Sequence, residues 1–535
     1  MIRPMSLAAL TAGLALAAGA AGAQPMPLSP YASAGEQQAA LTDRKVTSEQ
    51  LVRAYLERIQ RIDRAGPKLN AVLTLNPHAV DDARALDAER RAGKVRGPLH
   101  GVPILLKDNI ETADGTATTA GSLALAANVT GRDAPIVKRL REAGAIVLGK
   151  TNLSEWANFR STRSISGWSG VGGLVRNPYS LDRTACGSSS GSGAAVAAGL
   201  AAFAIGTETD GSVTCPAAMN GVVGLKPTVG LVSRTFIVPI SPEQDTAGPM
   251  TRTVADAAAM LNVIAGSDPA DPATKAADAH KANYLEGLKR DGLKGARIGV
   301  WFSWKGRSPQ TDAVFDAALQ ALRDQGAVLV EIKGPDDATN GKIAELEGET
   351  LRTEFKAALN AYLAATPAAV KSRTLEDLIA FNKTEPREMP LFNQEIFEAA
   401  QAKPPITDAG YIEKRATARK LAREALDKML ADNKLDAIVS PSGGPPSIVD
   451  PVNGSPFFGS PSRLPAVSGY PHLTVPAGYA TGLPVGISFL GPEWSEAKLL
   501  ALGYAFEQAT HARREPEFLP DVSARPEIGR AYDPR

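Results

Sequence analysis

From residue 100 onwards, short apolar runs alternate with amphipathic segments in a pattern typical of strands followed by helices. The apolar run 102–106 has the length of a buried strand, and 133–143, closed by Gly144, has helical periodicity. The same alternation predicts further strands at 145–148, 203–206, 297–302 and 327–332, and helices at 194–202, 254–265 and 311–324. This order predicts an α/β fold with a large mixed, mostly parallel sheet covered by helices on both faces.

The segments on either side of this region add helices. Thr47 and Gln50 form a capping box at the start of an amphipathic helix near the N-terminus. Residues 340–435 have a helical, charged pattern, which fits either a cap over a pocket or a packing layer. We find no repeat or linker that would divide the chain, so we expect a single domain over residues 24–535.

The first residues have the pattern of a secretory signal peptide. Arg3 supplies a positive charge, residues 7–20 are apolar, and Ala21–Ala23 form a small-residue cleavage site before Gln24. The apolar stretch is too short to span a bilayer comfortably, which favours a cleaved signal over an anchoring helix. We therefore expect a signal peptide over residues 1–23 and a periplasmic or secreted mature protein that is free of the membrane.

Charge, histidine and cysteine content narrow the function classes. The chain has 535 residues and a formal net charge of +1, which gives no electrostatic case for binding nucleic acid. His78 and His100 lack the spacing of a metal site, so we expect no metal centre. Cys186 and Cys215 can pair in an oxidising compartment, but pairing cannot be deduced from sequence. We favour the alternative that both are small buried apolar residues.

Two serine-containing loops and one lysine carry the candidate chemistry. Ser188 lies in the Gly/Ser loop Cys186–Gly193, Ser212 ends the run Gly206–Ser212, and Lys107 ends a predicted strand. A serine nucleophile needs a base, and no histidine lies near either serine in the sequence. A lysine at the end of a buried strand loses solvation, which lowers its pKa and lets the neutral amine act as the base. Ser188 can then relay a proton between Lys107 and Ser212.

Other interpretations of the Gly/Ser loop fit less well. A flexible linker is disfavoured because structured runs flank the loop closely, and a phosphate-binding loop would need a lysine at its end. Ser189 matches the G-x-S-x-G pattern of a nucleophile elbow, with Asp436 and His472 in the expected chain order. That elbow must follow a strand, whereas the preceding segment 176–182 is polar and interrupted by a proline. We therefore expect Ser189 not to be the nucleophile.

The motifs around these residues resemble those of the amidase signature family. The resemblance covers most of the mature chain and is carried by five motifs, at residues 101–109, 187–192, 206–216, 221–228 and 482–486. It implies the family fold, an α/β/α sandwich around a large mixed sheet, and a reaction that needs neither a metal nor an organic cofactor.

The resemblance also implies a role for each site residue. Ser212 would be the nucleophile, Ser188 the relay serine in a cis peptide, and Lys107 the base. Backbone amides of four residues would form the oxyanion hole: Thr209, Asp210, Gly211 and Ser212.

Several positions depart from the family pattern. Asp210 replaces the first of two glycines before the nucleophile, Thr214 replaces an arginine, and Glu208 stands where aspartate is common. Cys186 and Ser190 replace glycines of the first loop. These departures concern the shape of the acyl pocket, and they leave the two serines and the lysine unchanged.

Three short stretches look most like the bacterial peptide amidases, which release ammonia from C-terminal peptide amides: 158–160, 167–170 and 207–212. We therefore expect an exported amidohydrolase that cleaves a small-molecule or short-peptide amide through an acyl-enzyme. The alternatives are a glutamine-hydrolysing amidotransferase subunit, an aryl acylamidase, and a non-catalytic binding protein on the same fold. Neither the exact substrate nor the oligomeric state can be deduced from the sequence.

Overall fold

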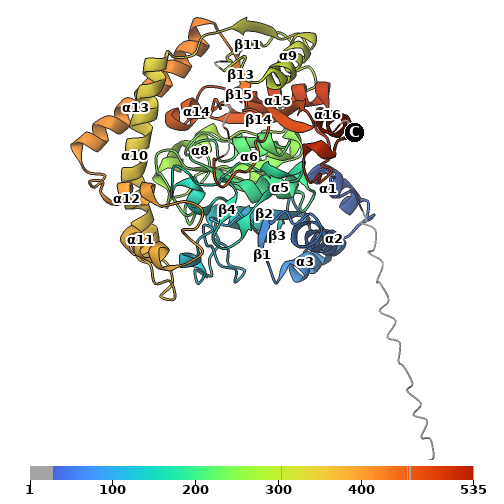
Figure 1. The fold of residues 1–535 in the computed structure, drawn as a ribbon. Helices are drawn as coiled ribbons and strands as arrows, with labels where there is room; N and C mark the ends of the chain where they lie inside the picture. Colours follow the sequence, from blue (N-terminus) through green and yellow to red (C-terminus); the bar gives the residue numbers. More distant parts are fainter. Residues whose placement is uncertain (1–27, 303, 455, 457–458, 534–535) are drawn as a thin grey trace, which may run out of the picture.

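The computed structural model describes residues 28–302, 304–454, 456 and 459–533 (Figure 1). The predicted signal peptide, residues 1–23, lies outside the described residues. The described chain forms one eleven-stranded sheet with helices on both faces, together with two short two-stranded sheets. The α/β class and the large mixed sheet are confirmed. Among the same residues, no helix combines the length and apolarity that crossing a bilayer requires.

The main sheet has the strand order β1-β3-β2-β8-β10-β9-β14-β15-β13-β11-β12. Its strands are β1 (Val72–Leu75), β2 (Pro103–Lys107), β3 (Ile146–Thr151), β8 (Phe203–Glu208), β9 (Val223–Lys226), β10 (Thr246–Thr251), β11 (Arg297–Val300), β12 (Val328–Glu331), β13 (Ala437–Pro441), β14 (His472–Ala480) and β15 (Leu483–Leu490). Parallel pairs join β3, β2 and β8 in one part of the sheet and β13, β11 and β12 in another. Antiparallel pairs connect these two parts and attach β1. The strands predicted from apolar runs are all present.

The central strands are buried on both faces, which is why they read as continuous apolar runs. All residues of β2, β8 and β15 are buried. Ile104 and Leu106 pack into one hydrophobic cluster and Leu105 into another, because successive strand residues point to opposite faces. The first cluster includes α4 (Pro135–Glu142), α7 (Val254–Ile264), α9 (Pro309–Asp324) and α15 (Glu496–Thr510). The second includes α2 (Ser48–Arg58), α3 (Ala79–Arg91) and α5 (Ser190–Ala197).

A layer of helices lies beside the sheet, at the left of Figure 1. The segment 340–435, predicted to be helical, contains α10 (Asp337–Ala364), α11 (Leu375–Thr384), α12 (Glu395–Gln401) and α13 (Ala409–Asp432). Helices α10 and α13 run side by side. Phe355 and Phe397 of this layer pack in one cluster with Ala120 and Trp156. The layer therefore covers the loops that follow β2 and β3.

Shorter elements complete the fold. The remaining α-helices are α1 (Ala34–Thr42), α6 (Thr214–Met219), α8 (Ala277–His280), α14 (Arg463–Ser468) and α16 (Pro526–Tyr532). Other short helical turns span Ile59–Arg64, Leu123–Leu125, Glu155–Asn158, Pro272–Ala276 and Val522–Ala524. The two small sheets pair β4 (Trp168–Ser169) with β5 (Gly173–Leu174), and β6 (Arg176–Asn177) with β7 (Ser180–Thr184).

Two local predictions have different outcomes. The capping box is confirmed, because the Gln50 N–H donates to Thr47 Oγ1 at 3.1 Å and the Thr47 N–H donates to Gln50 Oε1 at 2.9 Å. The expectation of no strand before the Gly/Ser loop is wrong, because β6 and β7 form a hairpin there. Pro178 lies between the two strands, where it interrupts no ladder bond. The hairpin lies outside the main sheet, and of its strand residues only Leu181 is apolar, so it has no apolar run that predicts a strand.

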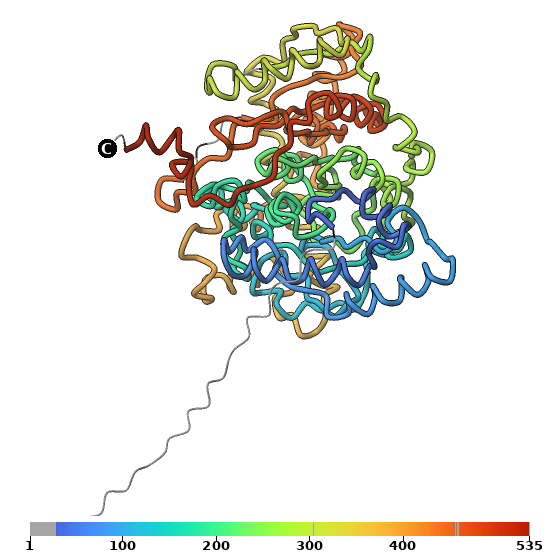
Figure 2. Tube along the Cα trace, turned by 90° about the vertical axis from the view of Figure 1, so that its right-hand side faces the viewer, coloured from blue at the N-terminus to red at the C-terminus, as the bar shows by residue number. Residues whose placement is uncertain are grey.

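The strands that carry the candidate site occupy the middle of the molecule. In Figures 1 and 2, the green segments around β8, β9 and β10 lie between the blue N-terminal segments and the red C-terminal ones. This central position explains why the side chains at the ends of β2 and β8 are buried.

Candidate active site

The three candidate residues come from neighbouring strands and loops. Strand β2 pairs in parallel with β8, so the two strands end side by side and place Lys107 next to Thr207. Ser188 lies in the loop before α5, and Ser212 lies in the loop between β8 and α6. The site is therefore built where the parallel part of the sheet ends.

Lys107 is fully buried, and three oxygen atoms surround its amine. Nζ lies 2.8 Å from Ser188 Oγ. It also donates to the Thr207 hydroxyl at 2.8 Å and to the Thr207 carbonyl oxygen at 3.3 Å. The same hydroxyl accepts from Asn109 Nδ2 at 2.9 Å. When both N–H bonds of the neutral amine point to Thr207, its lone pair faces the Ser188 hydroxyl.

Burial lowers the pKa of Lys107 to about 7, because the charged ammonium loses its hydration. The negative charges of Asp245 and Glu208 act in the opposite direction and limit this fall in pKa. At physiological pH, a large fraction of such an amine is neutral. The lowered pKa agrees with the one expected from the position of Lys107 at the end of a buried strand.

Ser188 is fully buried, and the peptide bond between Gly187 and Ser188 is cis. The Ser154 N–H donates to the Ser188 carbonyl oxygen at 3.0 Å, which ties the loop to the segment after β3. The Ser189 N–H donates to the Ser212 carbonyl oxygen at 3.1 Å. The two serine loops are therefore in direct contact, and together with the lysine they form one site.

Ser212 lies in a tight turn between β8 and α6. Gly211 has a φ of +78°, in the left-handed region that glycine adopts at little cost. The Cys215 N–H donates to the Gly211 carbonyl oxygen at 2.8 Å, which starts the helix. Within the described part of the chain, the backbone N–H groups of residues 209–212 have no protein acceptor. Four donors therefore remain free close to Ser212.

Glu208 fixes the segment that follows Ser212. Its Oε2 accepts from the backbone N–H groups of Val213 and Thr214 at 2.8 and 2.9 Å, and from the Thr214 hydroxyl at 3.2 Å. The two departures at Glu208 and Thr214 are thus in contact with each other. Burial raises the pKa of Glu208, while the Lys226 charge and the two N–H groups oppose that rise.

Asp245 fixes the segment that precedes Ser212. Thr209 Oγ1 donates to Asp245 Oδ1 at 2.6 Å. The Ile240 and Ser241 N–H groups donate to Asp245 Oδ2 at 2.8 and 2.9 Å. Since the Asp245 charge also raises the pKa of Lys107, one carboxylate supports both the turn and the lysine.

Thr207, Glu208 and Asp245 were not among the functional groups expected from the sequence. Thr207 and Glu208 belong to the motif that contains Ser212, and their place at the end of a predicted strand is the signal that could have found them. Asp245 precedes β10 in a segment without a predicted element. The antiparallel pairing of β10 with β8 brings it to the site, and no sequence pattern shows that pairing.

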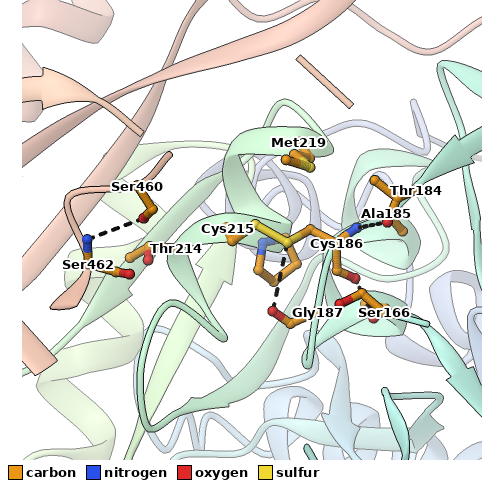
Figure 3. Close-up of a disulfide and its surroundings, with 12 residues drawn as sticks. Ser166, Thr184, Ala185, Cys186, Gly187, Thr214, Cys215, Met219, Ser460 and Ser462 are labelled. Atoms are coloured by element: carbon orange, nitrogen blue, oxygen red, sulfur yellow. Dashed lines mark hydrogen bonds between the residues drawn. A yellow bond between two sulfur atoms is a disulfide. The ribbon is translucent and has the colours of Figure 1, made fainter. Parts of the chain in front are cut away.

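Cys186 and Cys215 form a disulfide (Figure 3). The preference for two unpaired, buried apolar residues is therefore wrong. The physical reason is the contact between the two serine loops, which brings the two Cα atoms to 6.0 Å, a separation typical of a disulfide. Both cysteines are partly exposed.

The nucleophile-elbow alternative fails in the structure. Ser189 Oγ donates to the Thr207 carbonyl oxygen and accepts from the Thr207 N–H, both at 3.1 Å, so this serine joins the loop to β8. His472 lies in β14, where Nε2 is 2.6 Å from Ser488 Oγ, and burial lowers the pKa of His472 to about 3. Asp436 binds the N–H at the start of β11. Each of the three is therefore held in a separate place.

Two cavities border the site. One has a volume of about 210 Å³, and its lining includes Asn109, Thr207, Thr209, Ala358 of α10 and the segment 237–240. The other has a volume of about 320 Å³, and its lining includes Cys186, Met219 and the segments 162–166 and 449–454. Through Ala358, the helical layer forms part of a cavity wall as well as a packing layer. No group of three or more potential metal-ligating side chains in the described ranges is placed to hold a metal ion.

Comparison with known proteins decides the family. A family model described as Amidase matches residues 50–500. The chain belongs to the amidase family. It is similar to the peptide amidase from Stenotrophomonas maltophilia, with 50% identity, a TM-score of 0.85, and coverage of 91% of this chain and 99% of that chain. A crystal structure of a peptide amidase with the competitive inhibitor chymostatin gives 51% identity and a TM-score of 0.87, over 91% of this chain and 100% of that one.

Curated relatives include other amidases and a component of an amidotransferase. A protein of Arabidopsis thaliana whose description names it an amidase is 42% identical over 500 residues, 90% of each chain. A glutamyl-tRNA(Gln) amidotransferase subunit from Moorella thermoacetica is 36% identical over 513 residues, 91% of this chain and 98% of its own length. The protein is thus an amide-hydrolysing enzyme of the amidase family, with a strong likeness to peptide amidases.

We expect the kcat/KM of this amidase to rise with pH through about 7 and then to level off. Protonated Lys107 cannot accept a proton, so the active fraction falls about tenfold for each pH unit below the pKa. Lys107→Arg keeps the positive charge but cannot become neutral, and should lose about 10²–10⁴-fold in kcat/KM. A flat profile through pH 7, or an active Lys107→Arg variant, would contradict a base role for the lysine.

Glu208→Ala should lower kcat by about 100-fold, because the turn that carries Ser212 loses its acceptor and the serine shifts. Glu208→Gln keeps one acceptor oxygen at nearly the same size, and should recover part of the loss. Steady-state kinetics and thermal unfolding of both variants measure the effect. If Glu208→Ala lowers the Tm and leaves kcat unchanged, the carboxylate contributes to stability alone.

Proposed function

We propose that this amidase releases ammonia from the C-terminal amides of short peptides through Ser212, Ser188 and Lys107. The observation that carries the proposal is the 2.8 Å contact between the buried Lys107 amine and the Ser188 hydroxyl, at a pKa of about 7. A lysine that is neutral near physiological pH can supply the base that histidine provides in other serine hydrolases.

The reaction begins with two coupled proton transfers. Neutral Lys107 takes the proton of Ser188, Ser188 takes that of Ser212, and Ser212 Oγ forms a bond to the amide carbonyl carbon. The π electrons of the carbonyl move to its oxygen, and the free N–H groups of residues 209–212 bind this oxyanion. In other acyl-transfer enzymes, one such donor contributes about 10²–10³ to the rate.

The C–N bond breaks in the next step. The proton on Lys107 returns through Ser188 to the leaving nitrogen, because an amine leaves poorly as an anion. Ammonia departs and the acyl group stays on Ser212 as an ester. Water then attacks this ester while the same relay takes its proton, which releases the carboxylic acid and restores Ser212.

The substrate class is supported by the relatives and by the cavity beside the disulfide. The two crystal structures compared above are of peptide amidases, at about half sequence identity. The cavity of about 320 Å³ has the size of a small-ligand site. Its lining includes Arg163, Ser164, Asp450 and Asn453, which offer donors and acceptors to the backbone of a short peptide.

Ammonia release from a panel of amides tests this proposal. We expect dipeptide and tripeptide amides to be hydrolysed faster than free glutamine. They should also be hydrolysed faster than aryl anilides, whose reaction is followed by release of the aromatic amine. Ser212→Ala should lower the rate of ammonia release by more than the factor of about 10²–10³ that one oxyanion donor contributes. Ser189→Ala is the matched control on the adjacent serine and should lose far less, because its hydroxyl binds only the Thr207 backbone.

Other outcomes of the same panel would replace the proposal. Preference for glutamine would favour an amidotransferase component, and preference for anilides would favour an aryl acylamidase. If no substrate reacts and a fluorophosphonate probe fails to label Ser212, the protein is a binding protein on this fold.

We further propose that the enzyme works in the periplasm or outside the cell. Support comes from the signal pattern in residues 1–23, and a Cys186–Cys215 disulfide suits an oxidising compartment. N-terminal sequencing of the protein from a periplasmic or medium fraction should give Gln24 as the first residue. A variant without residues 2–23 should stay in the cytoplasmic fraction. Recovery of the full-length protein from the cytoplasm alone, starting at Met1, would contradict export.

A further inference from the structure

The disulfide joins the two loops that carry the two serines. Cys186 lies two residues before Ser188, and Cys215 lies three residues after Ser212. Figure 3 shows the bond crossing between the loops, with Gly187 next to it on one side and Thr214 on the other. A covalent link this close to both serines limits how far the loops can separate.

Cys186 has a backbone conformation that a cysteine adopts at a cost in free energy. Its φ is +54°, in the left-handed region that glycine populates freely and other L-residues avoid. The family pattern described above has a glycine at this position. The structure therefore has a strained residue where an unstrained one would fit, which points to a benefit from the cysteine side chain itself.

Most other contacts hold each loop to the sheet. Glu208 and Asp245 fix the turn around Ser212, and Thr207 binds the Ser189 hydroxyl of the first loop. Between the loops, the Ser189 N–H donates to the Ser212 carbonyl oxygen at 3.1 Å, and Asn220 at the end of α6 donates to the Ala185 carbonyl oxygen at 2.8 Å. Hydrogen bonds of this kind yield to small displacements, whereas the disulfide is a fixed length of covalent chain.

The bond is placed where a reductant can reach it. Cys186 and Cys215 are both partly exposed, and Cys186 borders the cavity of about 320 Å³. Thiol–disulfide exchange requires a thiolate to approach one of the two sulfurs, and this cavity gives it access.

We infer that the Cys186–Cys215 disulfide positions the Ser188 and Ser212 loops relative to each other, so that the enzyme reaches its full rate only when the bond is oxidised. Cys186 and Cys215 are positioning residues, since they act through the two serines. The inference rests on the proposed function for the roles of Ser188 and Ser212. With this role for the disulfide, the activity of the enzyme depends on the redox state of the compartment as well as on pH.

Reduction of the folded wild-type enzyme is the first experiment. Dithiothreitol supplies two electrons and two protons, the Cys186–Cys215 bond becomes two thiols, and the reagent becomes its cyclic disulfide. We expect kcat and the rate at which a fluorophosphonate labels Ser212 to fall together by about 10–100-fold. A small displacement of a nucleophile from its productive position lowers the rate by a factor of this order. Both should recover after reoxidation. A purely structural bond would lower the Tm and leave the labelling rate unchanged.

Three variants separate the bond from the residues that form it. Cys186→Gly removes the bond and also the backbone strain, and Cys215→Ser removes the bond from the other side. Each single variant and the double variant should match reduced wild type in labelling rate, and should no longer respond to dithiothreitol. Lys434→Gly is the matched control, because Lys434 is exposed, has a φ of +51° and lies far along the chain in the turn before β13. It should keep the wild-type rate and the response to reductant.

The outcomes distinguish this inference from the proposed function. The inference is overturned if reduced wild type, shown by thiol counting to hold two free cysteines, labels at the oxidised rate. If a variant fails to fold, reduction of the folded wild type still decides. If oxidised enzyme labels quickly but hydrolyses no peptide amide, the proposed function fails while the disulfide is still tested through labelling.

Discussion

The buried amine of Lys107 is the constraint on which the rest of the site depends. Burial removes the water that would stabilise its charge, and its pKa falls to about 7. The two carboxylates that oppose the fall are bound elsewhere, Asp245 to Thr209 and Glu208 to the residues after Ser212. They act on the lysine through space rather than as a close ion pair. A close pair would hold the amine in its charged form, and no carboxylate at all would leave its pKa lower still.

The same two carboxylates hold the Ser212 turn, Asp245 through the Thr209 hydroxyl and Glu208 through the residues that follow Ser212. Each carboxylate accepts from two backbone N–H groups. Without an acceptor, each of these buried groups would destabilise the fold by about 1–3 kcal/mol. The turn is thus held at both ends, while the N–H groups in its middle stay free. The pKa of Lys107 and the geometry of the Ser212 turn are therefore linked through shared groups, and a change at Asp245 or Glu208 affects both.

Much of this site could be predicted from the sequence, because its residues lie in short local motifs. Lys107 ends an apolar run with the length of a buried strand, and the run before Ser212 predicts a strand for the same reason. Contacts between segments that lie far apart in the sequence could not be predicted. Asp245 arrives through the antiparallel pairing of β10 with β8, and Cys186 meets Cys215 because two loops fold together. The β6–β7 hairpin was missed because a strand pair outside the main sheet needs no apolar run.

The groups around Lys107 and the walls of the two cavities come from different parts of the fold. The groups that set the reactivity of Lys107 sit on β2, β8 and the residues before β10, deep in the sheet. The cavity walls come from other parts: Ala358 belongs to α10, and the segments 162–166 and 449–454 belong to surface loops. Mutations in these walls can change which substrate fits without changing the pKa of Lys107. One reactive centre can therefore be reused for different amides as the surrounding walls diverge, consistent with a family that includes both peptide amidases and a component of an amidotransferase.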